Sequence, residues 1–216
     1  AEGSARMAER IGRGSDQMLA VARRQEFPYH DPRLKNAIGL GYAVSATGAD
    51  HMANLNDTFA TWDGADINAR LREFGMATPL ELWGISDHKI EAFHIETAFK
   101  NFLDSAVICH FYPYEFQHMV DAINGAGGWN VDKEEIVAIG ERIINAARQY
   151  LVREGFTAED DMLSPRAFQP TKEGPIAGKA MTPDYLRDAL QRYYKRMGWG
   201  VDGVPAEEVL QRFGIG

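Results

Sequence analysis

Three long stretches of this sequence carry apolar residues at helical spacing, and this periodicity constrains the fold more than any other feature. The first stretch spans about 87 to 104, the second begins at Asp132, and the third begins at Thr182. In the first, the apolar stripe consists of Ile90, Phe93, Phe99, Phe102 and Leu103. Strand signals are short, and no Asn-Gly hairpin separates two alternating runs. The sequence therefore predicts an all-α, multihelical chain.

Helix-boundary residues support two of these helices. Asp132 can cap a first turn while Glu135 reaches back toward it, and Gly155 is a natural stop. Thr182 is an expected N-cap before a proline, and Gly198 ends the third helix.

Weaker patterns predict helices near 2–25, 33–46, 115–123 and 206–213, the first of them interrupted around Gly12 and Gly14. The stretch from 160 to 179 is long, polar and proline-bearing, so we expect it to wrap over the helices or to cover something.

Charge and composition exclude several functions. The net charge is −8, from 23 basic and 31 acidic residues, which argues against binding nucleic acid or an anionic membrane. No stretch reaches the roughly 18 apolar residues of a membrane helix, and the sequence begins without a secretory signal. One cysteine allows no intrachain disulfide and fits a reducing compartment. We expect a soluble, cytoplasmic protein.

Two residues, Cys109 and His51, are candidates for a chemical role, and the sequence pattern around each allows two interpretations. Cys109 follows the first helix and is either a small buried hydrophobic residue or a metal ligand; with His110 and His118 it matches no common zinc pattern. His51 follows a glycine-rich segment and either transfers protons or satisfies a hydrogen bond in the core.

Other polar residues are interpreted as structural or solvated. His88 and His94 lie six positions apart on one predicted helix, which is a spacing that puts them on different faces. Asp160 and Asp161 are expected to cap a helix or to join a surface ion network with nearby arginines.

Short elements follow one another in order along nearly the whole chain. They are His30-Asp31-Pro32-Arg33, Leu40-Gly41-Tyr42-Ala43, Gly48-Ala49-Asp50-His51, the box at residues 104–109, Arg153-Glu154-Gly155-Phe156, Asp160-Asp161, Pro165-Arg166, Tyr193-Tyr194, Gly198-Trp199 and Gly203-Val204-Pro205. Together they resemble the C-terminal region of the tungsten-containing aldehyde ferredoxin oxidoreductase family, and the box at residues 104–109 is similar to the family's D-x-x-G-L-C box.

The resemblance implies a specific set of cofactors and roles. Family members bind a tungsten, rarely molybdenum, bis-pterin beside a [4Fe-4S] cluster, and they oxidise aldehydes to acids with ferredoxin as electron acceptor. Carried over, Cys109 would be the fourth cluster ligand, Asp104 and Ile108 would contact the pterin, and His51 would move protons at the metal centre. A thiolate is the ligand that cluster iron requires, and a carboxylate can accept paired N–H donors.

Two departures from the family pattern qualify this resemblance. Val107 stands where the family favours glycine, and it would restrict the backbone and crowd the pterin. Ala46-Thr47 precede Gly48 where the family usually has an arginine.

One cysteine cannot complete a four-cysteine cluster, so we expect the other ligands and a β-domain on preceding sequence or on another chain. Residues 1–30 would be a helical segment continuing from that domain, and residues 31–216 the C-terminal helical domain, inactive alone. A homodimer is compatible with this arrangement. The alternatives are a non-catalytic helical module for binding or assembly, and a family member that reduces aromatic thioesters.

Overall fold

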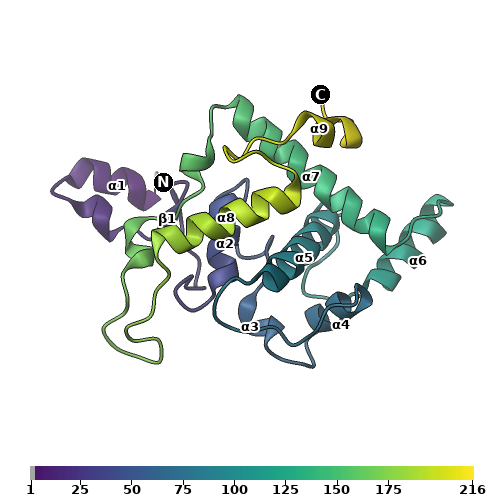
Figure 1. Cartoon of the computed structure of the whole chain (residues 1–216), viewed down its shortest axis with the longest axis horizontal. Coiled ribbons are helices and arrows are strands. Elements are labelled where there is room, and N and C mark those ends of the chain that lie inside the picture. Colours follow the sequence, from purple (N-terminus) through teal and green to yellow (C-terminus); the bar gives the residue numbers. More distant parts are fainter. Residues whose placement is uncertain (1–2) are drawn as a thin grey trace.

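The computed structural model describes residues 3–216 as helices joined by irregular loops (Figure 1). The all-α prediction is confirmed, because the only sheet in the described residues has two strands of two residues each. The helices are α1 (Gly3–Ile11), α2 (Asn36–Val44), α3 (Asp57–Ala60), α4 (Asp66–Glu73), α5 (Asp87–Ser105), α6 (Phe116–Gly127), α7 (Lys133–Arg153), α8 (Pro183–Met197) and α9 (Glu207–Phe213). Short 3₁₀ turns are η1 (Ser15–Met18), η2 (Ala158–Asp160) and η3 (Pro165–Phe168).

The three long helices form where the periodicity predicts them. The Thr182 side chain accepts a hydrogen bond from the amide of Tyr185 at the start of α8, and Gly198 ends that helix in the left-handed conformation. Asp132 caps α7 by accepting from the amide of Glu135 at 2.9 Å. The second bond of a capping box, from the Asp132 amide to the Glu135 side chain, is not present at the start of α7.

The core is centred on the packing of α7 along α5, with α8 packed against α5 and α2 (Figure 1). Gly140 makes this close approach possible, since a Cβ there would lie 2.0 Å from the carbonyl oxygen of Ala98. Aromatic side chains fill the space between the helices, and the largest fully buried ones are Tyr42, Phe93, Phe99, Phe116, Tyr193 and Tyr194. This packing holds α5 in place, and the candidate site lies at the C-terminal end of that helix.

The helix predicted over residues 2–25 is wrong beyond η1. Residue 2 lies outside the described residues, and the chain after η1 forms a hairpin of β1 (Val21–Ala22) and β2 (Gln25–Glu26). Its turn residues, Arg23 and Arg24, both have positive φ, a conformation that tight hairpin turns require and usually obtain from Asn or Gly. The hairpin was missed because arginine gives no turn signal.

The buried Asp161 explains why this turn is tolerated. Its carboxylate, fully inaccessible to solvent, accepts from the guanidinium of Arg23, from Arg148 at 2.8 Å and from the Tyr194 hydroxyl. Asp161 is therefore a core residue, and its predicted place in a surface network is wrong. Asp160 does act as a cap, accepting from the amide of Thr157 at 2.8 Å.

The remaining predictions are close to the structure. Helices α2, α6 and α9 lie at the predicted places, although α6 runs four residues further, to Gly127. Helix α4 was not predicted, since its first turn is polar and its apolar positions are few. Segment 160–179 packs back onto the hairpin, where Leu163 forms a bridge with Ala22.

None of the helices within residues 3–216 is both long and apolar enough to cross a bilayer.

Candidate functional site

The C-terminal end of α5 places three of the predicted site residues on one turn. The amide of Val107 donates to the carbonyl of Asp104 at 3.1 Å, and the amide of Ile108 donates to Leu103 at 2.9 Å. This pair of bonds is the Schellman ending of a helix, which requires a left-handed residue at the position of Val107. Val107 has φ +58°, and it stands where the resemblance described above implies a glycine.

The side chains of this turn are divided between core and solvent. Ile108 packs against the hydrophobic core, whereas Asp104, Val107 and Cys109 are exposed. The interpretation of Cys109 as a buried hydrophobic residue is therefore wrong. Val107 is 92% exposed, so within this chain its side chain crowds nothing.

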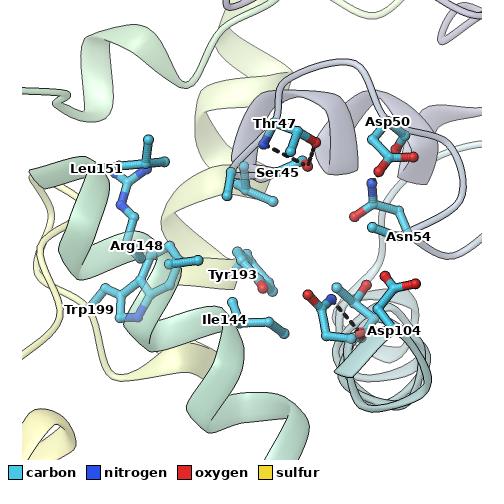
Figure 2. Close-up of a pocket in the computed structure, with 16 residues that line it drawn as sticks. Ser45, Thr47, Asp50, Asn54, Asp104, Ile144, Arg148, Leu151, Tyr193 and Trp199 are labelled. Carbon is cyan, nitrogen blue, oxygen red and sulfur yellow. Dashed lines mark hydrogen bonds between the residues drawn. The ribbon is translucent and has the colours of Figure 1, made fainter. Parts of the chain in front are cut away.

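Asp104 also lines a narrow cavity of about 140 Å³ between α5, α7 and the loop that follows α2. Figure 2 shows Asp50, Asn54 and Asp104 on one side of this space and Ile144 and Tyr193 on the other. Carboxylate and amide groups line one side, whereas aliphatic and aromatic side chains share the other with Arg148, and this mixture suits a partly polar ligand.

A wide cavity of about 500 Å³ lies beside the first and contains His51. Its floor is polar: Arg70 donates to both carboxylate oxygens of Glu96, at 3.0 and 2.7 Å, and Lys100 donates to the carbonyl of Asn54 at 2.6 Å. Burial lowers the pKa of Lys100. The volume is that of a pocket for a small organic molecule. Exposed aromatic side chains border it, namely Phe59, Trp62, Phe111 and Tyr112.

Two short connections join the cavities. Asp50 lines the narrow cavity while its neighbour His51 lines the wide one. Asp104 Oδ1 lies 2.9 Å from His110 Nε2, and the His110 ring lines the wide cavity. The predicted residues thus form one region, in which Asp104, Ile108 and Cys109 share a turn and His51 faces the adjoining space.

Sequence reasoning missed three residues of this region. His30 belongs to the element at residues 30–33, where the sequence gives it no chemical role. Its ring nevertheless lies 4.7 Å from that of His51, centroid to centroid. Lys100 carried a weak signal, a cation on an otherwise apolar helix stretch. His110 was considered only as a partner of Cys109 for zinc.

His88 and His94 both make hydrogen-bonding contacts within the fold, as their interpretation as structural residues implies. His94 is buried with Nε2 2.6 Å from Glu141 Oε1, and His88 Nε2 lies 2.8 Å from the carbonyl of Ala77.

These residues fit the family's cofactors only as part of a larger set. Within residues 3–216, no three His, Cys, Asp or Glu side chains converge to hold a metal ion. Cys109 nevertheless offers an exposed thiol at a helix end, where a thiolate can reach iron outside this chain. Asp104 offers an exposed carboxylate one turn earlier, suited to accept N–H donors.

Comparison with known proteins agrees with the ordered elements. A family described as "Aldehyde ferredoxin oxidoreductase, domains 2 & 3" matches residues 1–215. The chain is 32% identical over 219 residues to the tungsten-containing aldehyde ferredoxin oxidoreductase of Pyrococcus furiosus, and 31% identical to that of Thermococcus kodakarensis. Both alignments cover 100% of this chain and 33% of the relative, so the chain spans about a third of their length.

Two further matches differ in what they describe. An aliphatic sulfonate oxidoreductase WOR-like subunit from Pyrococcus furiosus is 30% identical over 184 residues, which is 82% of this chain and 24% of the relative. Among solved structures, the active site complex BamBC of benzoyl coenzyme A reductase, in complex with 1,5-dienoyl-CoA, matches with a TM-score of 0.64. That match covers 97% of this chain and 35% of the other at 16% identity, and it shows a common fold.

Proposed function

The chain belongs to the aldehyde ferredoxin oxidoreductase family, and from this membership we propose that it is the C-terminal helical part of a tungstopterin and [4Fe-4S] oxidoreductase. The complete protein would oxidise an aldehyde and water to a carboxylic acid, releasing two electrons and two protons, with ferredoxin as electron acceptor. The N-terminal cofactor-binding domain would lie on the same or another chain, and this part alone would be inactive.

The observation that carries the proposal is the turn that ends α5. Its left-handed residue lies where the family favours glycine, and this geometry exposes Cys109 and Asp104 together. A free cysteine is usually buried as a small apolar residue, so an exposed thiol at this position favours a ligand role. Cys109 would supply one of four thiolates to the cluster.

The other residues of the region have separate tasks. Asp104 would accept N–H donors of the pterin, and the backbone of Ile108 would lie against it. His51, in the wide cavity, would hold or release a proton as the substrate is oxidised. When bound, the metal centre supplies the redox chemistry and the cluster carries electrons away.

The wide cavity suits the proposed substrate. The space has polar groups on its floor and aromatic side chains at its border, so it can take an aldehyde group and an apolar body in one orientation.

The test uses the complete protein. We expect tungsten or molybdenum together with iron, and aldehyde-dependent reduction of ferredoxin. The variant His51→Asn should retain the metals and lose about 100-fold or more in kcat, because a positioned acid–base group contributes that much. The matched control is His88→Asn, at the opposite end of α5, which should keep full activity. A protein without either metal centre would show instead a non-catalytic assembly module.

A further inference from the structure

The loop before α2 holds His30 in one position. Asp31 accepts from the amide of Arg33 at 2.9 Å and pairs with the Arg33 guanidinium through both carboxylate oxygens. The hydroxyl of Tyr42, a fully buried residue, donates to the carbonyl of His30 at 3.0 Å. The backbone at His30 is thus anchored from both the loop and the core.

Lys35 fixes which nitrogen of the His30 ring carries the proton. Lys35 is 8% exposed, and its Nζ lies 2.7 Å from His30 Nδ1 and 3.1 Å from Asn56 Oδ1. Because an ammonium group only donates, the Asn56 atom that faces Lys35 is the amide oxygen, and it also accepts from the Thr58 hydroxyl at 2.9 Å. Lys35 therefore donates to both groups, and Nδ1 must be the unprotonated nitrogen of a neutral ring with its hydrogen on Nε2.

Burial and the charges around His30 favour the neutral ring. Burial, and then the charges of Lys35 and His51, lower the pKa of His30 below its ordinary value. A protonated ring would give up its acceptor at Nδ1 and place a second cation 2.7 Å from the ammonium. The other charged groups near the pair are Asp31 with Arg33, Asp57 near Lys35, and Arg70, Glu96, Lys100 and Asp66 along the wide cavity.

His30 and His51 share the wall of the wide cavity, with ring centroids 4.7 Å apart and ring planes at 54°. With Nδ1 occupied by Lys35, the only donor left on His30 is Nε2–H, on the other side of the ring. The contact with Lys35 therefore makes the two rings chemically unequal, because it occupies Nδ1 of His30.

We propose that Lys35 and His30 act as positioning residues for His51. Lys35 holds His30 in the neutral Nε2–H tautomer, and the neutral His30 ring leaves proton transfer to His51. The catalytic half of this statement rests on the proposed function of His51. The tautomer is a property of the 216-residue chain itself and can be measured without cofactors.

The first experiment is ¹⁵N-edited NMR of the histidine rings in this chain, with the His30 signals assigned through His30→Gln. We expect His30 as the Nε2–H tautomer, titrating below the ordinary histidine value of 6.5. Lys35→Met should move the His30 titration to higher pH and mix the tautomers, and Lys35→Arg should restore the single tautomer. Lys172→Met, an exposed lysine, is the control that should change neither.

An Nδ1–H tautomer in the unsubstituted chain, or a His30 titration that Lys35→Met leaves unchanged, would overturn the proposal. Circular dichroism of each variant would show whether the fold is kept; if Lys35→Met unfolds the chain, the unsubstituted chain still decides the tautomer.

The second experiment is the pH profile of kcat/KM in the complete protein. Lys35→Met should move the acidic limb to lower pH, because His30 then takes up a proton and its positive charge disfavours protonation of His51, while Lys172→Met leaves the profile unchanged. An unmoved acidic limb would contradict the positioning role. If His51→Asn keeps full activity while the tautomer is as stated, the proposed function fails and the structural half of this inference stands.

Discussion

The two ends of helix α5 treat polar groups in opposite ways. At the N-terminal end, the Ser86 side chain caps the helix, and one turn later Lys89 is completely buried. Its ammonium donates to Asp57 at 3.0 Å and to the carbonyls of Leu82 and Gly84 at 3.1 and 3.0 Å. The Asp57 carboxylate also accepts from two amides at the start of α2. Every charge here is matched inside the chain.

At the C-terminal end, the groups are left open. Asp104 and Cys109 are exposed, Val107 occupies a left-handed conformation, and the two ring nitrogens of His110 are buried without a hydrogen-bond partner in residues 3–216. Nε2 of that ring is close to Asp104 but lacks hydrogen-bond geometry. The contrast indicates that one end of α5 stabilises the fold and that the other is built to bind.

The largest expected effect is a difference in stability between a variant at the N-terminal end of α5 and a variant at its C-terminal end. Asp57→Ala leaves the Lys89 ammonium buried without its counter-ion, so it should lower the free energy of unfolding by about 3–5 kcal/mol. Asp104→Ala removes an exposed carboxylate and should change it by less than about 0.5 kcal/mol. Urea unfolding of the 216-residue chain measures both. Equal losses in the two variants would remove the distinction between the ends.

A smaller effect of opposite sign is expected at the open end. A β-branched residue in the left-handed region is strained by about 1–2 kcal/mol, and glycine relieves this strain at some entropic cost. Val107→Gly should therefore raise the free energy of unfolding by about 1 kcal/mol.

The matched control for this change is Val201→Gly, since Val201 is 81% exposed and its φ is not positive. It should bring no gain. If both glycine variants destabilise the chain, the turn at Val107 is not strained.

The smallest expected effect is a pH dependence from His30, whose environment lies between the two extremes. Because its pKa is lowered in the folded chain, the unfolded chain binds more protons, and stability falls as pH drops below the ordinary histidine value of 6.5. His30→Gln should remove this part of the decline. Unfolding measured at pH 7.5 and 5.5 in both proteins gives the difference, and parallel pH profiles would show that His30 does not contribute.

The sequence predicts well those helices and helix ends that depend on nearby residues. The apolar stripe of α5, the Asp132 cap and the Thr182-Pro183 start depend on local rules, and each appears in the structure. The hairpin at Arg23 and Arg24 does not follow from local preference. It depends on Asp161, a partner more than 130 residues away, and no local pattern announces that contact.

The candidate site was predictable only in part and for a similar reason. The ordered elements led to Cys109, Asp104 and His51, but the functions assigned to them remain proposals. The neighbours His30, Lys35 and Lys100 belong to separate segments that meet only in the folded chain. Spacing along the sequence could not show that a lysine donates to one histidine of a pair.

In the complete protein, the open end of α5 would supply Cys109 to an iron–sulfur cluster. Iron content and the electron paramagnetic resonance spectrum of the reduced complete protein test it directly in Cys109→Ala, with Ser105→Ala, an exposed residue on the same helix end, as control. We predict that Cys109→Ala loses the [4Fe-4S] signal while the 216-residue chain unfolds at an unchanged urea midpoint. An unaltered cluster signal and iron content in Cys109→Ala would contradict the account.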